Sequence, residues 1–158
     1  MIYVICALKC EAQAFIDKYK LDKSKKNELI AIIVSGVGKQ NMQDATSRVV
    51  LEMQSNDIIL NVGICGANES FEIGELVDAS EHRLTCVDNE VSQSDVYTLV
   101  DMESDGFLKA TKDVKNSYIF KIVSDHFQPK SITKEFAKSL VFNAIDDINR
   151  LLKQKVKK

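Results

Sequence analysis

The sequence predicts an α/β fold, a three-layer sandwich with a mostly parallel central sheet. Short, uninterrupted apolar runs alternate along the chain with longer segments whose apolar residues recur at helical spacing. The apolar runs at residues 2–8 and 29–34 show no alternation of apolar and polar positions, as expected for parallel strands covered on both faces. At 158 residues the chain is long enough for one domain core, so we expect residues 1–158 to form a single domain.

The first half of the chain contains three expected strands and two expected helices. In order these are strand 2–8, helix 11–19, strand 29–34, helix 41–53 and strand 57–62. Glycines follow two of the strands, in Ser-Gly-Val-Gly at residues 35–38 and in Gly-Ile-Cys-Gly-Ala at residues 63–67. Glycine adopts backbone dihedrals that other residues resist, and it lets main-chain N–H groups approach a ligand. The first segment, residues 35–38, is therefore either a candidate part of a binding site or only a turn between a strand and a helix.

The second half begins with short elements and ends with a long helix. We expect strands at 72–79, 82–91 and 98–101, a helix at 102–111, a strand at 118–123 and a helix at 131–153. The last helix carries one apolar face over several turns, which predicts that it packs against the sheet.

Composition and charge argue against several classes of function. The chain has 45% hydrophobic residues, 28% charged residues and a net charge of −2, as in an ordinary globular domain. A chain of this charge is not attracted to nucleic acid or to a membrane surface, so we expect neither as a partner. The lysines at the C-terminal end are expected to form a solvated helix end, where the helix dipole favours them.

The cysteines and histidines do not form a metal-binding pattern. Cys6, Cys10, Cys65 and Cys86 include no CxxC pair, and the chain has two histidines. We therefore expect no metal and no cofactor. The sequence shows no signal-peptide pattern and no apolar run approaching about 18 residues. Free thiols suit a reducing compartment, so we expect a cytoplasmic protein.

Three acidic residues follow expected strands. Glu11 lies just beyond the first strand, Glu103 beyond the strand before the third helix, and Asp125 beyond the last strand. Because the carboxyl ends of parallel strands meet at one edge, where open α/β sheets bind ligands, we expect the three carboxyl groups to converge on one crevice. Alternatively, Glu11 and Glu103 are solvated first-turn residues favoured by the helix dipole, and Ser124 and Asp125 merely end a strand.

Six motifs resemble those of a known family. They are ALKCEA at residues 7–12, SGVGK at 35–39, NVGICGA at 61–67, GELVDAS at 74–80, VDMES at 100–104 and VSD at 123–125. With these motifs the chain resembles the purine nucleoside phosphorylase and nucleosidase superfamily, and within it the 5′-methylthioadenosine/S-adenosylhomocysteine nucleosidases, in a shortened form. The resemblance implies a nucleoside phosphorylase-like fold, a purine nucleoside as small-molecule partner, a homodimer, and a place in purine metabolism and methionine salvage.

The resemblance also implies catalytic roles for three residues. Cleavage of a purine N-ribosidic bond passes through an oxocarbenium-like state, and the leaving base needs a proton at N7. Asp125 would donate that proton, which requires a protonated carboxyl group of the kind that burial favours. Ser124 would hold this carboxyl group in place, and Glu11 would deprotonate the attacking water.

Further residues are expected to bind the substrate. By the same resemblance, Glu103 would accept hydrogen bonds from the ribose 2′ and 3′ hydroxyl groups, and the thioether of Met102 would pack against the sugar. Gly66, Ser35 and Lys121 complete the expected substrate-binding set.

The chain departs from the family at several positions. Family members are usually longer, and the missing residues fall between 78 and 100, where the family has an aromatic residue and main-chain groups that contact the base. Tyr97, Phe107 and Phe127 are either substitutes for this aromatic residue or members of the core. The nucleosidases have a serine where this chain has Ile64 and an arginine where it has Lys121. Both positions help to hold the attacking water in the family.

These departures leave three functions open. The first is hydrolysis of an adenosine-type nucleoside, which is favoured because no arginine follows a glycine-rich strand end, where a phosphate would need one. The second is phosphorolysis, with phosphate attracted by Lys9 and Lys39. The third is a nucleoside-binding or assembly domain of the same fold without catalysis.

Overall fold

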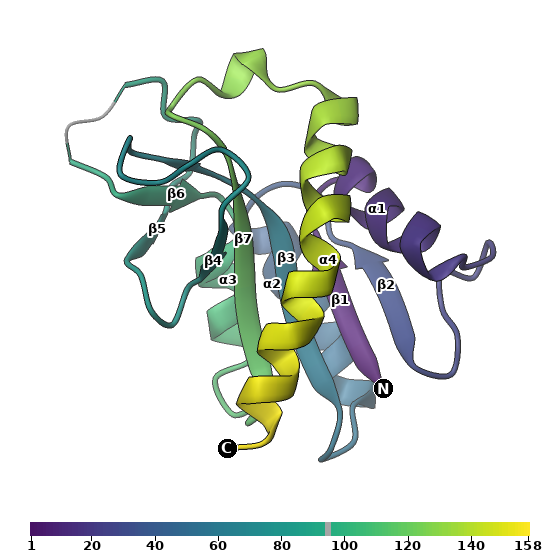
Figure 1. Ribbon diagram of the computed structural model, residues 1–158. Coiled ribbons are helices and arrows are strands. Elements are labelled where there is room, and N and C mark those ends of the chain that lie inside the picture. Colours follow the sequence, from purple (N-terminus) through teal and green to yellow (C-terminus); the bar gives the residue numbers. More distant parts are fainter. Residues whose placement is uncertain (94–95) are drawn as a thin grey trace.

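The computed structural model of the chain describes residues 1–93 and 96–158. It confirms a three-layer α/β fold with a mostly parallel central sheet (Figure 1). The described strands are β1 (Ile2–Cys6), β2 (Ile30–Val34), β3 (Ile58–Ala67), β4 (Leu76–Asp78), β5 (Leu84–Cys86), β6 (Leu99–Asp101) and β7 (Ser117–Asp125). The described helices are α1 (Lys9–Tyr19), α2 (Lys39–Glu52), α3 (Ser104–Ala110) and α4 (Lys134–Val156), with a 3₁₀ turn at Pro129–Ser131.

The parallel part of the sheet is built around β1, β3 and β7. Strand β1 lies between β2 and β3, and β7 lies along the other edge of β3; all of these pairings are parallel. Strand β4 adds an antiparallel edge to β7. The apolar runs of the sequence thus occupy strands that are covered on both faces, as predicted.

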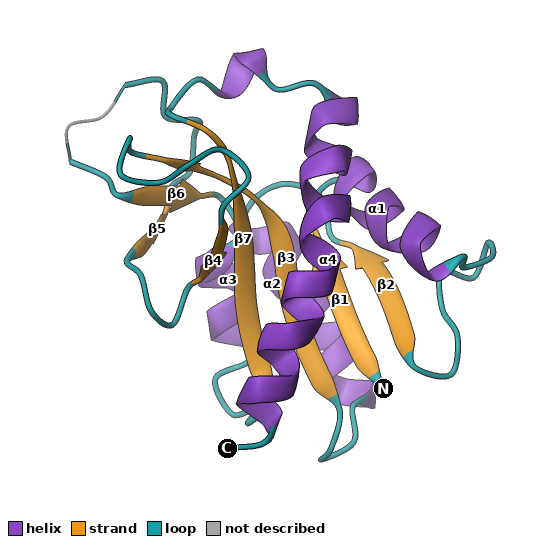
Figure 2. Cartoon of the chain, viewed as in Figure 1, coloured by secondary structure: helices purple, strands orange, loops and turns teal. Residues whose placement is uncertain are grey.

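The sheet forks at the far end of β3. Residue Gly66 pairs with Asp125 of β7 and also with Val100 of β6, so β6 lies on the same edge of β3 as β1. Pairing with β1 ends at Asn61, and pairing with β6 covers Gly66 and Ala67. Among the described residues, no strand therefore pairs with residues 62–65 on that edge. Figure 2 shows β5 and β6 on the left of the view, well apart from β1 and β2 on the right.

Two pairs of helices cover the faces of the sheet. Helices α1 and α4 lie on one face, where Phe15, Val141 and Ile145 join the largest apolar cluster of the core. Helices α2 and α3 lie on the other face, where Met42 and Phe107 pack in a second cluster. No helix of the described residues is long and apolar enough to cross a membrane.

The predicted elements differ most from the structure in the middle of the chain. The strands expected at 72–79 and 82–91 shrink to β4 and β5, of three residues each. The third strand, expected at 57–62, continues through the glycine-rich segment 63–67 because β7 pairs with it along this length. The last helix starts at Lys134 because the Thr133 hydroxyl caps it by accepting a hydrogen bond from the Phe136 N–H.

Candidate active site

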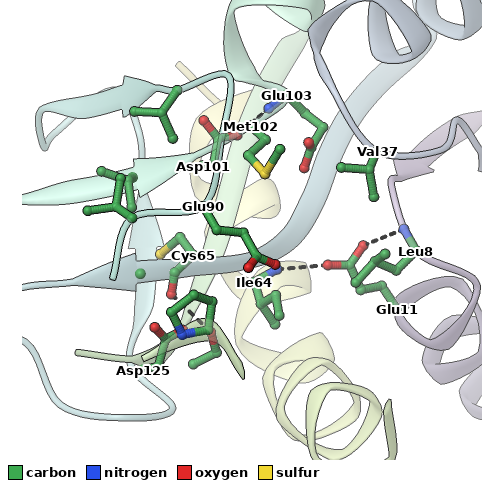
Figure 3. A pocket seen from close by; sticks show the side chains of 16 residues that line it. Leu8, Glu11, Val37, Ile64, Cys65, Glu90, Asp101, Met102, Glu103 and Asp125 are labelled. Atoms are coloured by element: carbon green, nitrogen blue, oxygen red, sulfur yellow. Dashed lines mark hydrogen bonds between the residues drawn. The ribbon is translucent and has the colours of Figure 1, made fainter. Parts of the chain in front are cut away.

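A cavity of about 180 Å³ lies in the fork of the sheet. Its lining combines apolar side chains with several carboxyl groups, which Figure 3 shows around one space. Six residues expected from the sequence line it: Glu11, Gly66, Met102, Glu103, Ser124 and Asp125. The expected convergence of the three acidic residues is therefore present in the structure.

Glu11 reaches the cavity from the first turn of α1. Its Oε2 accepts a hydrogen bond from the Leu8 N–H at 2.9 Å, and its Oε1 accepts one from the Ile64 N–H at 3.0 Å. The Ile64 amide belongs to the unpaired edge of β3, so the carboxylate takes the place of a strand there. Glu11 is 2% exposed, which makes the solvated first-turn interpretation wrong. Burial raises the pKa of Glu11, although the two amides and the Lys121 ammonium oppose the shift.

Glu103 occupies the turn between β6 and α3. Its Oε2 accepts a hydrogen bond from the Gly38 N–H at 2.9 Å, and the residue is buried. Gly38 has a φ of 99°, a backbone conformation that favours glycine. The Gly38 N–H was expected to approach a ligand, but in the structure it donates to Glu103 instead. Burial raises the pKa of Glu103; Lys121 and the Gly38 amide oppose this shift, and Asp101 adds to it.

The route by which Glu103 reaches the cavity differs from the prediction. The sequence argument placed it at the carboxyl end of a parallel strand, but β6 runs antiparallel to β3. Glu103 lines the cavity because β6 points back toward the opening left between β1 and β6. The solvated interpretation of Glu103 is also wrong, since the residue is 8% exposed.

Ser124 and Asp125 end β7. Val123 pairs with Cys65 and Asp125 pairs with Gly66, so Ser124 is an extra residue in a β-bulge, a feature that redirects side chains. The Ser124 hydroxyl lies 2.5 Å from Asp125 Oδ1, and the Gln128 N–H donates to Asp125 Oδ2 at 2.7 Å. The bulge and these two contacts fix the carboxyl group at the cavity wall.

Two expected substrate-binding residues, Ser35 and Lys121, do not line the cavity. The Ser35 hydroxyl donates to its neighbour's carbonyl oxygen, Gly36 O, at 2.8 Å. Lys121 is buried outside the cavity lining, and its Nζ lies 3.0 Å from Asp101 Oδ2. Its neighbours in the fold, not a ligand, therefore satisfy its charge.

Two acidic residues of the cavity were missed in the sequence. Asp101 lies in the VDMES motif, where the spacing of two acids was a signal that could have identified it. Glu90 belongs to residues 87–93, between β5 and β6, and its side chain points into the cavity (Figure 3). No periodicity or motif marks this segment. Tyr97, Phe107 and Phe127 are outside the cavity, and no aromatic side chain of the described residues lines it.

The cavity has no positively charged lining and no metal cluster in the part of the chain that the structure describes. The described lining residues include neither lysine nor arginine. Likewise, no three His, Cys, Asp or Glu residues among those described are arranged to hold a metal ion. The arrangement suits proton transfer and hydrogen bonding to hydroxyl groups by carboxyl groups.

The sequence matches no protein-family model and no curated protein. The structure is similar to the 5′-methylthioadenosine/S-adenosylhomocysteine nucleosidase of Colwellia psychrerythraea 34H in complex with adenine, at 16% identity and a TM-score of 0.73, covering 97% of this chain and 94% of that chain. It is also similar to futalosine hydrolase of Helicobacter pylori strain 26695, at 10% identity and a TM-score of 0.75, covering 97% of both chains.

A third similar structure is a mutant of the Helicobacter pylori 5′-methylthioadenosine/S-adenosylhomocysteine nucleosidase with 5′-methylthioadenosine in its active site. It shares 11% identity and a TM-score of 0.76, and the match covers 97% of this chain and 98% of that chain. At these identities the similarity establishes the fold, so this chain has the fold of the nucleosidases, as its motifs predicted.

Proposed function

We propose that this chain, which has the nucleosidase fold, hydrolyses the bond between base and ribose in an adenosine-type nucleoside. One observation carries the proposal: Glu11, Glu103 and Asp125, from three distant segments, line one cavity. The structural neighbours support it, because two of them hold adenine or 5′-methylthioadenosine. We also propose that residues 1–158 act as a single domain and assemble as a homodimer in the cytoplasm.

Asp125 is the proposed general acid. A purine leaves more readily when its N7 is protonated, and a positioned acid contributes roughly 10²–10⁴-fold to the rate. Asp125 is buried at the cavity wall, with Ser124 and the Gln128 amide fixing its orientation. Each carboxyl oxygen accepts one of these contacts and keeps a second site for a proton or a ligand.

Glu11 is the proposed general base. Each of its oxygens accepts one backbone N–H and retains a lone pair that can take a proton from water. A pKa raised by burial brings Glu11 closer to the operating pH, which suits a general base. The two backbone amides hold the carboxylate rigidly, so an attacking water would be placed without reorganisation.

Glu103 and Met102 are proposed to hold the ribose. One Glu103 oxygen accepts the Gly38 N–H, which leaves the other to accept hydrogen bonds from sugar hydroxyl groups. Met102 lies between the end of β6 and Glu103, and it lines the cavity with a flexible apolar side chain. Carboxylates near the sugar also favour the positive charge of an oxocarbenium-like state.

Water is favoured over phosphate as the nucleophile. Glu11, Glu90, Glu103 and Asp125 line the cavity, and the described lining residues include no cation to attract a phosphate dianion. Lys39, one of the two lysines considered for phosphate, instead forms an exposed ion pair with Asp88.

A panel of nucleosides tests the proposal. Adenosine, 5′-methylthioadenosine, S-adenosylhomocysteine and inosine are incubated with the protein, with and without phosphate, and the free base is measured by liquid chromatography. We expect base release without phosphate. Release that depends on phosphate and yields ribose 1-phosphate would indicate phosphorolysis. Thermal stabilisation by a nucleoside without product would indicate the non-catalytic binding domain.

A further inference from the structure

We propose that Lys121 and Asp101 act as a positioning pair, which holds the turn carrying Glu103 at the cavity. This inference rests on the proposed function, because it assigns the pair to the ribose-binding part of the same site. It also gives Lys121 a role different from the contact with water that the resemblance implies for this position.

The pair is buried, and Asp101 accepts hydrogen bonds from the main-chain N–H groups of the two residues that follow Met102. Lys121 Nζ lies 3.0 Å from Asp101 Oδ2, and their side chains are 2% and 1% exposed. Asp101 Oδ2 also accepts hydrogen bonds from the Ser104 N–H at 2.9 Å and the Glu103 N–H at 3.3 Å. The Ser104 hydroxyl lies 2.5 Å from Asp101 Oδ1. Asp101 therefore fixes the backbone of Glu103 at the start of α3.

Glu103 is consequently held at two places. Asp101 fixes its backbone, and the Gly38 N–H fixes one oxygen of its side chain. Lys121 belongs to β7, four residues before Asp125. The ion pair therefore connects the turn that carries the proposed ribose ligand with the strand that carries the proposed acid. If the turn or the strand moves, the distance between Glu103 and Asp125 therefore changes.

Lys121 also provides the positive charge in a group of carboxylates. Burial alone would lower its pKa, but Asp101, Glu103 and Glu11 outweigh burial and raise it, so the side chain stays charged. Cys6 of β1 and Cys65 of β3 are the other titratable groups that interact with it. The Lys121 charge in turn lowers the pKa of Glu11 and of Glu103 against the effect of burial.

Three variants test the pair: Lys121→Met, Asp101→Asn and the double variant. Lys121→Met leaves Asp101 buried without a counterion, so the Tm of this variant should fall below that of the parent. The double variant should regain part of the lost Tm. In both variants lacking Lys121 we expect kcat/KM for adenosine to fall by about a hundredfold, mainly through KM, because Glu103 loses its position.

The pH dependence of kcat/KM separates positioning from a merely structural role. Without Lys121, the pKa of Glu11 and that of Glu103 should rise, so the acid limb of the profile should move to higher pH. In Asp101→Asn one negative neighbour of Glu103 is removed, and the acid limb should move to lower pH. A purely structural pair would lower the rate without moving the acid limb in opposite directions in the two kinds of variant.

The ion pair of Lys155 and Asp78 provides a matched control. It joins α4 to β4 at 2.5 Å, and neither residue lines the cavity. Lys155→Met and Asp78→Asn should lower the Tm while leaving KM and the pH profile as in the parent. An unchanged KM and pH profile in both variants lacking Lys121 would overturn the inference.

A calorimetric titration with adenosine distinguishes failure of this inference from failure of the proposed function. If the parent binds adenosine but releases no adenine, hydrolysis is refuted, and the dissociation constants of the same variants test the pair. About hundredfold weaker binding without Lys121 would then support it, and equal binding would refute it. A parent that binds none of the nucleosides of the panel would refute both proposals.

Discussion

Gly63 and Glu11 are in such close contact that a β-carbon on Gly63 would lie 2.9 Å from Glu11 Oε1. Because Gly63 has no side chain, the Glu11 carboxylate has room to reach the Ile64 N–H on the unpaired edge of β3. With any larger residue at this position the Glu11 carboxylate would have to shift, and we expect it to move away from the Ile64 amide. A single methyl group at this position therefore tests whether the placement of Glu11 matters.

We expect Gly63→Ala to lower nucleoside hydrolysis by about a hundredfold, because a base displaced by a fraction of an ångström loses its alignment. The measurement is kcat/KM for adenosine, with circular dichroism to verify the fold. A fully active, folded Gly63→Ala protein would show that the contact between Glu11 and the Ile64 amide is not needed for catalysis.

Asp125→Asn should abolish most of the hydrolysis. Asparagine keeps the shape of the side chain but cannot donate an acid proton, so we expect a loss of roughly 10²–10⁴-fold in kcat. Asp113→Asn changes an exposed aspartate away from the cavity and serves as the control. Equal kcat values for Asp125→Asn and Asp113→Asn would exclude Asp125 as the general acid.

Glu103→Gln should stabilise the protein at neutral pH and weaken nucleoside binding. Burial raises the folded-state pKa of Glu103, so its contribution to stability is present below the unfolded value of about 4.3 and is lost as the pH rises through the folded pKa. Glutamine stays neutral and can still accept the Gly38 N–H. The Tm of the variant should exceed that of the parent at about pH 8, and this gain should shrink at about pH 4.

The control for Glu103→Gln is the same substitution at a solvated glutamate. Glu28→Gln removes an exposed acid, and its Tm should show no such dependence on pH. If Glu103→Gln were less stable than the parent at both pH values, the burial of the charge would not be the dominant cost at this residue.

Glu90→Gln should admit anionic ligands. Glu90 adds a carboxylate to a cavity whose described lining residues include no cation, so adenosine 5′-monophosphate should bind more weakly than adenosine in the parent. Removing this charge should improve binding of the nucleotide relative to the nucleoside by about tenfold at low salt. Titration calorimetry measures both affinities. An unchanged ratio would mean that Glu90 does not face the 5′ substituent.

The sequence was sufficient to predict the layers of the fold and six of the residues that line the cavity. The apolar runs that form β1, β2 and β7 show no alternation of apolar and polar residues, and the apolar residues of α4 recur on one face over several turns. Both patterns arise because these residues are buried, so both can be recognised in the sequence. Glu11, Glu103 and Asp125 were identified from their positions after strands and from the motifs around them. The roles assigned to them remain proposals.

Other parts of the site depend on long-range pairing that no local pattern shows. The antiparallel direction of β6 follows from its two contacts with β3, and β6 is too short to reveal its direction in the sequence. Lys121 was expected to contact a ligand, and its pairing with Asp101 depends on how β7 and β6 meet in space. Glu90 lies in an irregular segment, where composition alone gives no position.

The fork has a consequence for how substrate enters. Strand β6 joins β3 through the pairs of Gly66 with Val100 and Ala67 with Leu99, and β5 is attached through β6. Because this pairing is short, it should open more easily than the longer pairing between β3 and β7. The amide hydrogens of the β3–β6 pairing should therefore exchange sooner with deuterium. We therefore expect β5 and β6 to move relative to the rest of the sheet when the proposed ligand binds, so that its affinity would depend on the stability of the pairing between β3 and β6.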